Sequence, residues 1–191
     1  PAISDAVTLE GWVAIGAYPW NWTPVVQQGH EESYALSIGP HGSVAMSVKA
    51  GGQLVKAESK PQLATKRWSH VAGTYDKSSG AVRVFIDGKL CNEQAAPKDG
   101  VARSESPIQI GKGAPMGQSD PVRFSDPHDF SFDGLFDEVR IYNLAMTPEQ
   151  VAASCALLGM SDPARAKPDL DRRILPAGLK TGKFGAYYTH L

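Results

Sequence analysis

Apolar and polar residues alternate with a period of two along much of this chain, which is the pattern of half-buried β-strands. In residues 7–13 the apolar positions share one side, while Thr8, Glu10 and Trp12 share the other, so we expect both faces of this strand to be partly covered. Further short extended segments follow at residues 25–28, 33–38, 43–49, 53–57, 67–75, 82–86, 89–92 and 106–111. The 19 glycines and 14 prolines are spread along the chain. The pattern therefore predicts an all-β domain of short strands joined by tight turns.

Two residue pairs mark predicted hairpin turns. Gly51-Gly52 and Asp87-Gly88 each separate two neighbouring strand segments. Tight two-residue turns need positive φ angles, which glycine adopts at no steric cost. We therefore expect an antiparallel hairpin at each pair.

One short helix is predicted after the last strand. Thr147 is a suitable N-cap, Pro148 suits the first helical position, and Gln150 can complete a capping box. The apolar positions that follow fall on one side of a helix, and Gly159 can end it. This helix would lie against an otherwise all-β body.

The composition changes after residue 160. Residues 161–191 carry six basic and three acidic side chains and finish with an aromatic segment at 184–188. We divide the chain into a domain at 1–160 and an extended segment at 161–191. The second part is a linker whose aromatic tail either docks on the domain or begins a following domain.

The bulk composition excludes several classes of function. A formal net charge of -1 provides no long-range field for nucleic acid or an anionic membrane. No apolar run approaches the ~18 to 20 residues of a membrane span. Cys91 and Cys155 are too few for a disulfide scaffold and lack metal-ligand spacing, so they either pair or stay free.

Three segments carry a resemblance to a known family. They are residues 68–76 (WSHVAGTYD), 82–89 (VRVFIDGK) and 132–143 (FDGLFDEVRIYN). In this order they resemble the laminin-G-like jelly rolls of the concanavalin A-like lectin and glucanase superfamily. The resemblance implies a two-sheet antiparallel β-sandwich (jelly roll), to which the patterns described above add one short C-terminal helix and an extended tail. It also implies an accessory module of a secreted, extracellular or periplasmic, glycan-processing protein.

The resemblance further implies a structural calcium ion. Family members often hold Ca²⁺ with a carboxylate at the start of the last long strand, and the matching position here is Asp137. Calcium takes ~6 to 8 oxygen ligands, so backbone carbonyls and water would have to contribute. Alternatively, Asp137 caps a turn or pairs with a surface cation, while the adjacent Glu138 faces solvent or an arginine.

Aromatic side chains gather before the second strand. Tyr18, Trp20 and Trp22 lie in a segment interrupted by Pro19 and Pro24, which predicts a loop. Exposed indole and phenol rings can stack on the C–H faces of sugars. The alternative is that these rings fill the edge of the core.

A long polar loop is predicted at residues 112–129. Its Arg123 and His128 could recognise sugar hydroxyls, and an arginine suits a uronate or sulfate group. The alternative is an ordinary solvated loop. His70 lies within a strand segment and is predicted to be a structural histidine rather than a catalytic base.

Catalytic motifs are not found in the sequence. Glycoside hydrolysis generally needs two carboxylates facing each other, whereas Asp137 and Glu138 are neighbours that point to opposite faces of a regular strand. We therefore predict a non-catalytic module that binds a polysaccharide or oligosaccharide. The runner-up is a protein-interaction or spacer domain that packs on a catalytic domain of the same polypeptide. A degenerate hydrolase or lyase fragment would rest on fold analogy alone.

Overall fold

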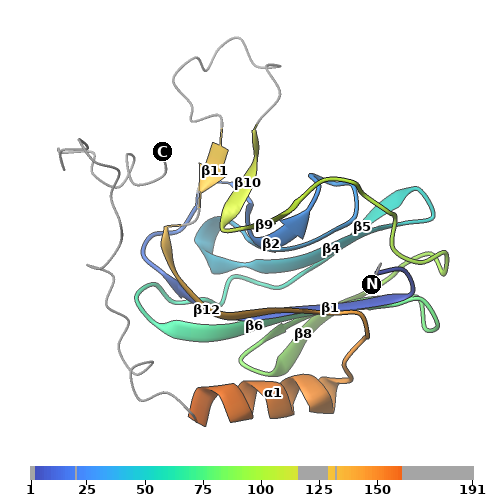
Figure 1. Cartoon of the computed structure of the whole chain (residues 1–191). Helices are drawn as coiled ribbons and strands as arrows, with labels where there is room; N and C mark the ends of the chain where they lie inside the picture. The colour runs from blue at the N-terminus through green and yellow to red at the C-terminus, as the bar shows by residue number, and fades with distance from the viewer. Residues whose placement is uncertain (1–2, 20, 116–128, 132, 161–191) are drawn as a thin grey trace.

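The computed structural model describes residues 3–19, 21–115, 129–131 and 133–160. Two antiparallel five-stranded sheets lie face to face (Figure 1), which confirms the predicted β-sandwich. Sheet A contains, in spatial order, β12 (Gly134–Tyr142), β1 (Ala6–Ile15), β6 (Trp68–Asp76), β7 (Ala81–Ile86) and β8 (Lys89–Ala95). Sheet B contains β5 (Gln53–Glu58), β4 (Val44–Ala50), β3 (Tyr34–Ile38), β2 (Thr23–Gln28) and β9 (Ile108–Ile110).

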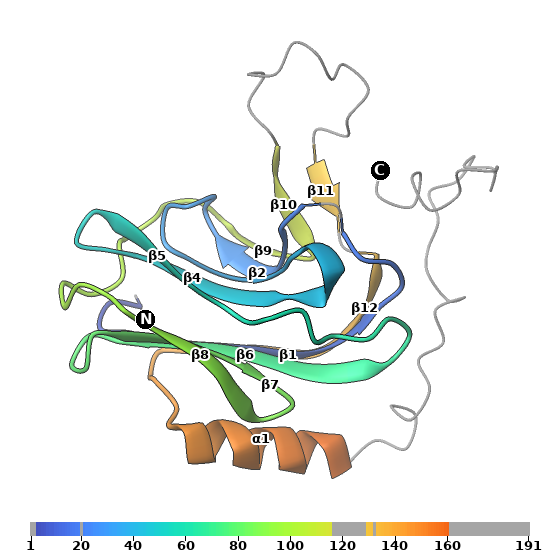
Figure 2. The ribbon, with the colours of Figure 1, turned by 180° about the vertical axis from the view of Figure 1, so that it is seen from behind.

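Three smaller elements complete the described structure. The 3-10 helix η1 (Pro40–Gly42) connects β3 to β4. β10 (Lys112–Pro115) pairs with β11 (Asp129–Ser131), so the ends of the predicted 112–129 loop form a two-stranded ribbon instead. The helix α1 (Pro148–Met160) lies on the outer face of sheet A (Figure 2). No helix among the described residues is long and apolar enough to cross a membrane.

The main core lies between the two sheets and follows the sequence alternation. Alternate residues of β1, including Val7, Leu9 and Val13, point into it and are at most 1% exposed. Alternate residues of β3 and β4, such as Leu36 and Met46, meet them from sheet B. Each fully buried aliphatic side chain of this kind contributes roughly 1.5–3 kcal/mol through removal from water.

A second, smaller apolar cluster fixes α1 to sheet A. Ala72 and Phe85 point outward from sheet A and pack with the fully buried Val151 of the helix. Both faces of β1 and β6 are therefore covered, one by the core and the other by the helix side. This arrangement agrees with the prediction that both faces of the strand at residues 7–13 are partly covered.

The pairing of β1 with β12 contains a β-bulge. Trp12 lies opposite Asp137 and Glu10 lies opposite Arg140, so two steps along β1 match three steps along β12. The extra residue falls at Glu138, whose φ is 53°. A bulge shifts the alternation of side chains by one position. Phe136 and Val139 therefore both pack against the main core, although an uninterrupted strand would place them on opposite faces.

Candidate functional site

The outer face of sheet B carries small and polar side chains in two rows across the strands. Because Leu36, Met46 and their alternating neighbours point into the core, the residues between them point outward. The cross-strand register places these outward residues side by side. The first row is Gln109, Gln27, Ala35, Ser47 and Lys56, and the second is Pro24, Ser37, Ala45 and Glu58.

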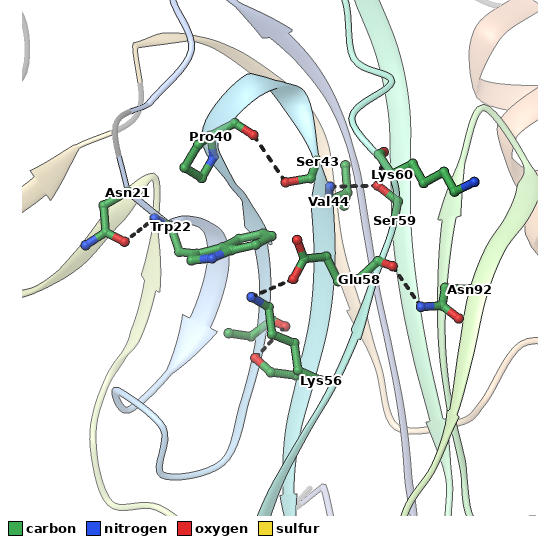
Figure 3. A network of polar contacts seen from close by, with 12 residues as sticks. Asn21, Trp22, Pro40, Ser43, Val44, Lys56, Glu58, Ser59, Lys60 and Asn92 are labelled. Atoms are coloured by element: carbon green, nitrogen blue, oxygen red, sulfur yellow. Dashed lines mark hydrogen bonds and ion pairs between the residues drawn. The ribbon is translucent and has the colours of Figure 1, made fainter.

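The Trp22 indole extends over this outer face. Figure 3 shows it pointing from the residue before β2 towards Lys56 and Glu58 of β5. The Lys56 Nζ atom lies 3.4 Å from the centroid of the indole ring, within the range of a cation–π interaction. Since β3 and β4 separate β2 from β5, the two side chains together bridge these middle strands. Ala45 of β4 points outward between them and is only 1% exposed.

Glycine at position 39 makes room for the indole. A Cβ atom on Gly39 would lie 2.6 Å from Trp22 Cη2 and 2.7 Å from Ser43 Oγ, closer than real Cβ contacts. The Trp22 backbone N–H also donates a hydrogen bond to Asn21 Oδ1 at 2.7 Å. The position of the indole is thus set both by the residues just before β2 and by the turn at residues 39–43.

Tyr18 contacts the same turn from the preceding loop. Its hydroxyl donates a hydrogen bond to the Leu63 carbonyl at 2.8 Å, and its side chain remains 43% exposed. A Cβ atom on Gly42 would lie 2.9 Å from Tyr18 Cε1. Between the two glycines, the exposed His41 has a φ of 62°, a left-handed conformation uncommon for residues other than glycine. The structure therefore brings Tyr18 and Trp22 to one turn.

The end of β5 next to Trp22 is held by polar contacts. Lys56 Nζ forms an ion pair with Glu58 Oε2 at 3.1 Å (Figure 3). The Glu58 carbonyl accepts a hydrogen bond from Asn92 Nδ2 of β8 at 2.8 Å, and the Val44 N–H donates to Ser59 Oγ at 2.9 Å. Both bonds fix the backbone that carries Lys56 and Glu58.

The remaining predicted ligand-binding residues lie outside the described part of the chain. They are Trp20, Arg123 and His128. The stem of the 112–129 segment is described, and it leaves sheet B beside the start of β2, where the Gly111 N–H donates to the Val25 carbonyl at 3.1 Å. The β10 end of the stem thus lies at the same end of sheet B as Trp22. A binding rim shared with Arg123 and His128 stays a prediction.

Asp137, the predicted calcium ligand, lies on β12 opposite Trp12. The described residues contain no group of three or more His, Cys, Asp or Glu side chains that could hold a metal ion. Glu138, which follows Asp137, forms an ion pair with Arg140, one of the two alternatives that the sequence left open. In the described part of the chain, Asp137 therefore lacks the carboxylate cluster of a strong calcium site, and calcium binding stays a prediction.

A buried polar network under α1 was not predicted from the sequence. Glu10 is fully buried, and its Oε1 accepts hydrogen bonds from Tyr142 Oη and Ser154 Oγ, both at 2.9 Å. His70 Nε2 lies 3.3 Å from Glu10 Oε2, and Arg140 Nη1 lies 3.9 Å from Oε1. Burial by itself raises the pKa of Glu10, but the contacts with His70, Ser154 and Tyr142 outweigh it and lower the pKa.

This network has a structural role. Glu10 and His70 are both 0% exposed, so neither can meet a ligand from solvent. Ser154 belongs to α1 and Tyr142 to β12, so the network joins the helix to sheet A. His70 is the structural histidine that the sequence predicted. The sequence did not identify Glu10 as the partner of His70. It indicated only that the face of residues 7–13 that carries Glu10 is partly covered.

The two cysteines stay free. Cys91 packs against the main core. Cys155 lies on α1 close to Gly88, because a Cβ atom added to Gly88 would lie 3.3 Å from Cys155 Cβ. Burial raises the pKa of both thiols, which makes them less reactive.

Comparison with known proteins gives a match to one family. The family model for laminin-G-like domains, described as the concanavalin A-like lectin/glucanases superfamily, matches residues 2–152. No curated protein matches the chain.

Solved structures with the same fold come from several sources. A proposed carbohydrate-binding protein from Bacteroides ovatus ATCC 8483 is 26% identical with a TM-score of 0.58, and the match covers 78% of this chain and 40% of that one. The binding domain of Paraclostridial Mosquitocidal Protein 1 is 13% identical with a TM-score of 0.60, covering 83% and 39%. A SAP-like pentraxin from Limulus polyphemus is 12% identical with a TM-score of 0.56, covering 87% and 76%. The chain thus spans less than half the length of the Bacteroides protein.

Proposed function

Since the chain belongs to the concanavalin A-like lectin/glucanases superfamily, we propose that it is a non-catalytic module that binds a polysaccharide or oligosaccharide. The proposed site is the end of sheet B that carries Tyr18 and Trp22. The Bacteroides ovatus structure, which is described as a proposed carbohydrate-binding protein, supports this assignment.

The convergence of Tyr18 and Trp22 on the turn at residues 39–43 carries the proposal. Aromatic rings that are held rigidly offer apolar faces for sugar rings at little entropic cost. The adjoining rows supply polar groups for sugar hydroxyls, among them the partly exposed Ser37, Ser47 and Gln109. α1 lies on the opposite side of the sandwich, and within the described part of the chain no helix covers this face (Figure 1).

The wider setting is part of the same proposal. A module of this type would belong to a larger secreted protein that processes glycans, acting outside the cell or in the periplasm. A calcium ion at Asp137 would stabilise the junction of β12 with β1, with backbone carbonyls and water as its other ligands. It would act on stability and would take no part in the stacking at Trp22.

Isothermal titration calorimetry of the chain against a panel of polysaccharides tests the proposal, first with calcium and then with EGTA. We expect at least one polysaccharide to bind, and Trp22→Ala to weaken this binding about tenfold through loss of the stacking surface. Leu90→Ala is the matched control, because Leu90 is an exposed apolar residue on sheet A.

Other outcomes separate the alternatives. If no polysaccharide of the panel binds and the thermal transition is intact, the protein-interaction or spacer domain is favoured. Release of reducing sugars by the purified chain would overturn the non-catalytic assignment. A melting temperature that EGTA does not change would argue against the calcium ion without affecting the sugar site.

A further inference from the structure

The contact between Lys56 and Trp22 has a consequence for the kind of sugar that can bind. We infer that Lys56 is a specificity-determining residue that selects glycans bearing a negatively charged group. This inference rests on the proposed function, because it concerns the ligand of the same site. The charged group would be a carboxylate, as in a uronic acid, or a sulfate ester.

The lysine occupies one face of the Trp22 indole ring. Its Nζ lies 3.4 Å from the indole centroid, which leaves no room for a sugar ring between them. A neutral sugar that stacks on this face must therefore displace the ammonium, and the cation–π interaction is then lost. The indole in this state is a poor platform for an uncharged sugar.

The contacts of Lys56 are suited to being exchanged. The side chains of Lys56 and Glu58 are 36% and 47% exposed, and ion pairs at this exposure contribute little to stability. An ammonium group has three N–H donors, and Lys56 Nζ lies 3.1 Å from Glu58 Oε2 in an ion pair. The other donors can turn towards a ligand while the aliphatic part of the side chain stays near the indole.

An anionic sugar makes use of this arrangement. Its carboxylate or sulfate can accept a charge-assisted hydrogen bond from Lys56 and draw the ammonium away from the centre of the ring. The sugar gains the freed ring face together with the hydrogen bond, whereas a neutral sugar gains only the ring face. Glu58 opposes the ligand, because it competes for Lys56 and repels the incoming charge.

Two substitutions separate these effects. Lys56→Met removes the charge and keeps an unbranched chain next to the indole, so we expect about tenfold weaker binding of an acidic glycan. Glu58→Gln removes the competing carboxylate and should strengthen acidic binding about twofold to fivefold. Lys77→Met is the control, because Lys77 pairs with Asp5 at the same 3.1 Å and is 42% exposed. Lys77 directly follows β6 of sheet A, whereas Lys56 lies on β5 of sheet B.

The binding measurements use polygalacturonate, dextran sulfate and neutral dextran at a fixed ionic strength. Binding to either acidic probe that falls in Lys56→Met, rises in Glu58→Gln and is unchanged in Lys77→Met supports the inference. The probe that responds distinguishes a uronate from a sulfate. An equal fall in Lys56→Met and Lys77→Met shows only general attraction between charges and overturns it.

The proposed function can survive failure of this inference. If a neutral polysaccharide from the calorimetry panel binds in a manner that depends on Trp22 and Lys56→Met does not weaken any acidic glycan, the sugar site stands and the charge selectivity is wrong. If neither acidic nor neutral glycans bind the folded chain, both proposals fail.

Discussion

Glu10 is a charged residue in a fully buried position, and its neighbours compensate for the loss of water. Tyr142 and Ser154 donate hydrogen bonds to it, and His70 lies 3.3 Å away. An unpaired carboxylate at this depth would take up a proton instead. The lowered pKa of Glu10 means that the folded protein favours the ionised form.

Replacing Glu10 tests this compensation. The unfolded chain binds a proton on Glu10 near its ordinary pKa of 4.5, and the folded chain does so only at lower pH. The stabilisation by Glu10 is therefore complete above this value and is lost as the pH falls through the lowered pKa. We expect Glu10→Gln to reduce the free energy of unfolding by about 1–3 kcal/mol at pH 7, and by less at pH 3.5.

Urea unfolding at the two pH values measures the effect. Glu105→Gln is the control, because the Glu105 side chain is 89% exposed and should leave the free energy of unfolding nearly unchanged. A loss of stability in Glu10→Gln that is the same at both pH values would show that hydrogen bonding, and not the charge of Glu10, matters.

The contacts of single residues were the least predictable part of the molecule. Alternation placed Glu10 on the outer face of β1, but the partners come from β6, β12 and α1, which are 60 to more than 140 positions away. Similarly, the loop composition singled out Trp22. Gly39 meets it only because the turn after β3 lies beside the start of β2, and Lys56 meets it only because the two side chains reach each other across β3 and β4.

The start of α1 shows how a local signal becomes a stable element. The Gln150 N–H donates to Thr147 Oγ1 at 3.3 Å, and the Thr147 N–H donates to Gln150 Oε1 at 2.9 Å. These reciprocal bonds are the predicted capping box, and they satisfy two backbone donors at the helix start. One turn later, Val151 is fully buried against Ala72 and Phe85.

Removing the cap should weaken the helix and its packing together. We expect Thr147→Ala to lower the free energy of unfolding by about 1 kcal/mol, because one helical N–H loses its acceptor. Thr147→Ser keeps the hydroxyl and should stay within a few tenths of 1 kcal/mol of the parent. Urea unfolding compares the three proteins, and equal losses in both variants would contradict the capping role.

Elements whose signals are local in sequence were predicted correctly. The turn between β7 and β8 has positive φ at Asp87 (49°) and Gly88 (74°), as its sequence required. The bulge at Glu138 and the β10–β11 pairing were missed, since both depend on how two distant strands align. Residues 112–115 are polar or small and predict a loop when this segment is considered alone.

At the scale of the whole molecule, the described core is confined to the first four-fifths of the sequence. Every buried member of the main core lies between Val7 and Val101, and the helix adds Val151. Both sheets are complete by Tyr142, and α1 ends at Met160. The predicted boundary after residue 160 stays a prediction, because residues 161–191 lie outside the described part of the chain.

Truncation tests this boundary. A chain ending at residue 160 should melt within about 2 °C of the full chain, because no buried core residue is removed from the described structure. Differential scanning calorimetry measures both transitions. A larger fall in the melting temperature would show that residues 161–191 dock on the sandwich, which is the other alternative suggested by their aromatic composition.

The bulge in β12 also bears on how copies of the protein avoid joining one another. β12 is an edge of sheet A, and an uninterrupted edge offers unpaired backbone groups on which another chain can add a strand. Glu138 breaks that regular spacing and places a charged pair with Arg140 along the rim. On sheet B, the edge strand β9 has only three residues, although Ile108 and Ile110 are about half exposed. Strand addition at these two edges, β12 and β9, is thereby disfavoured.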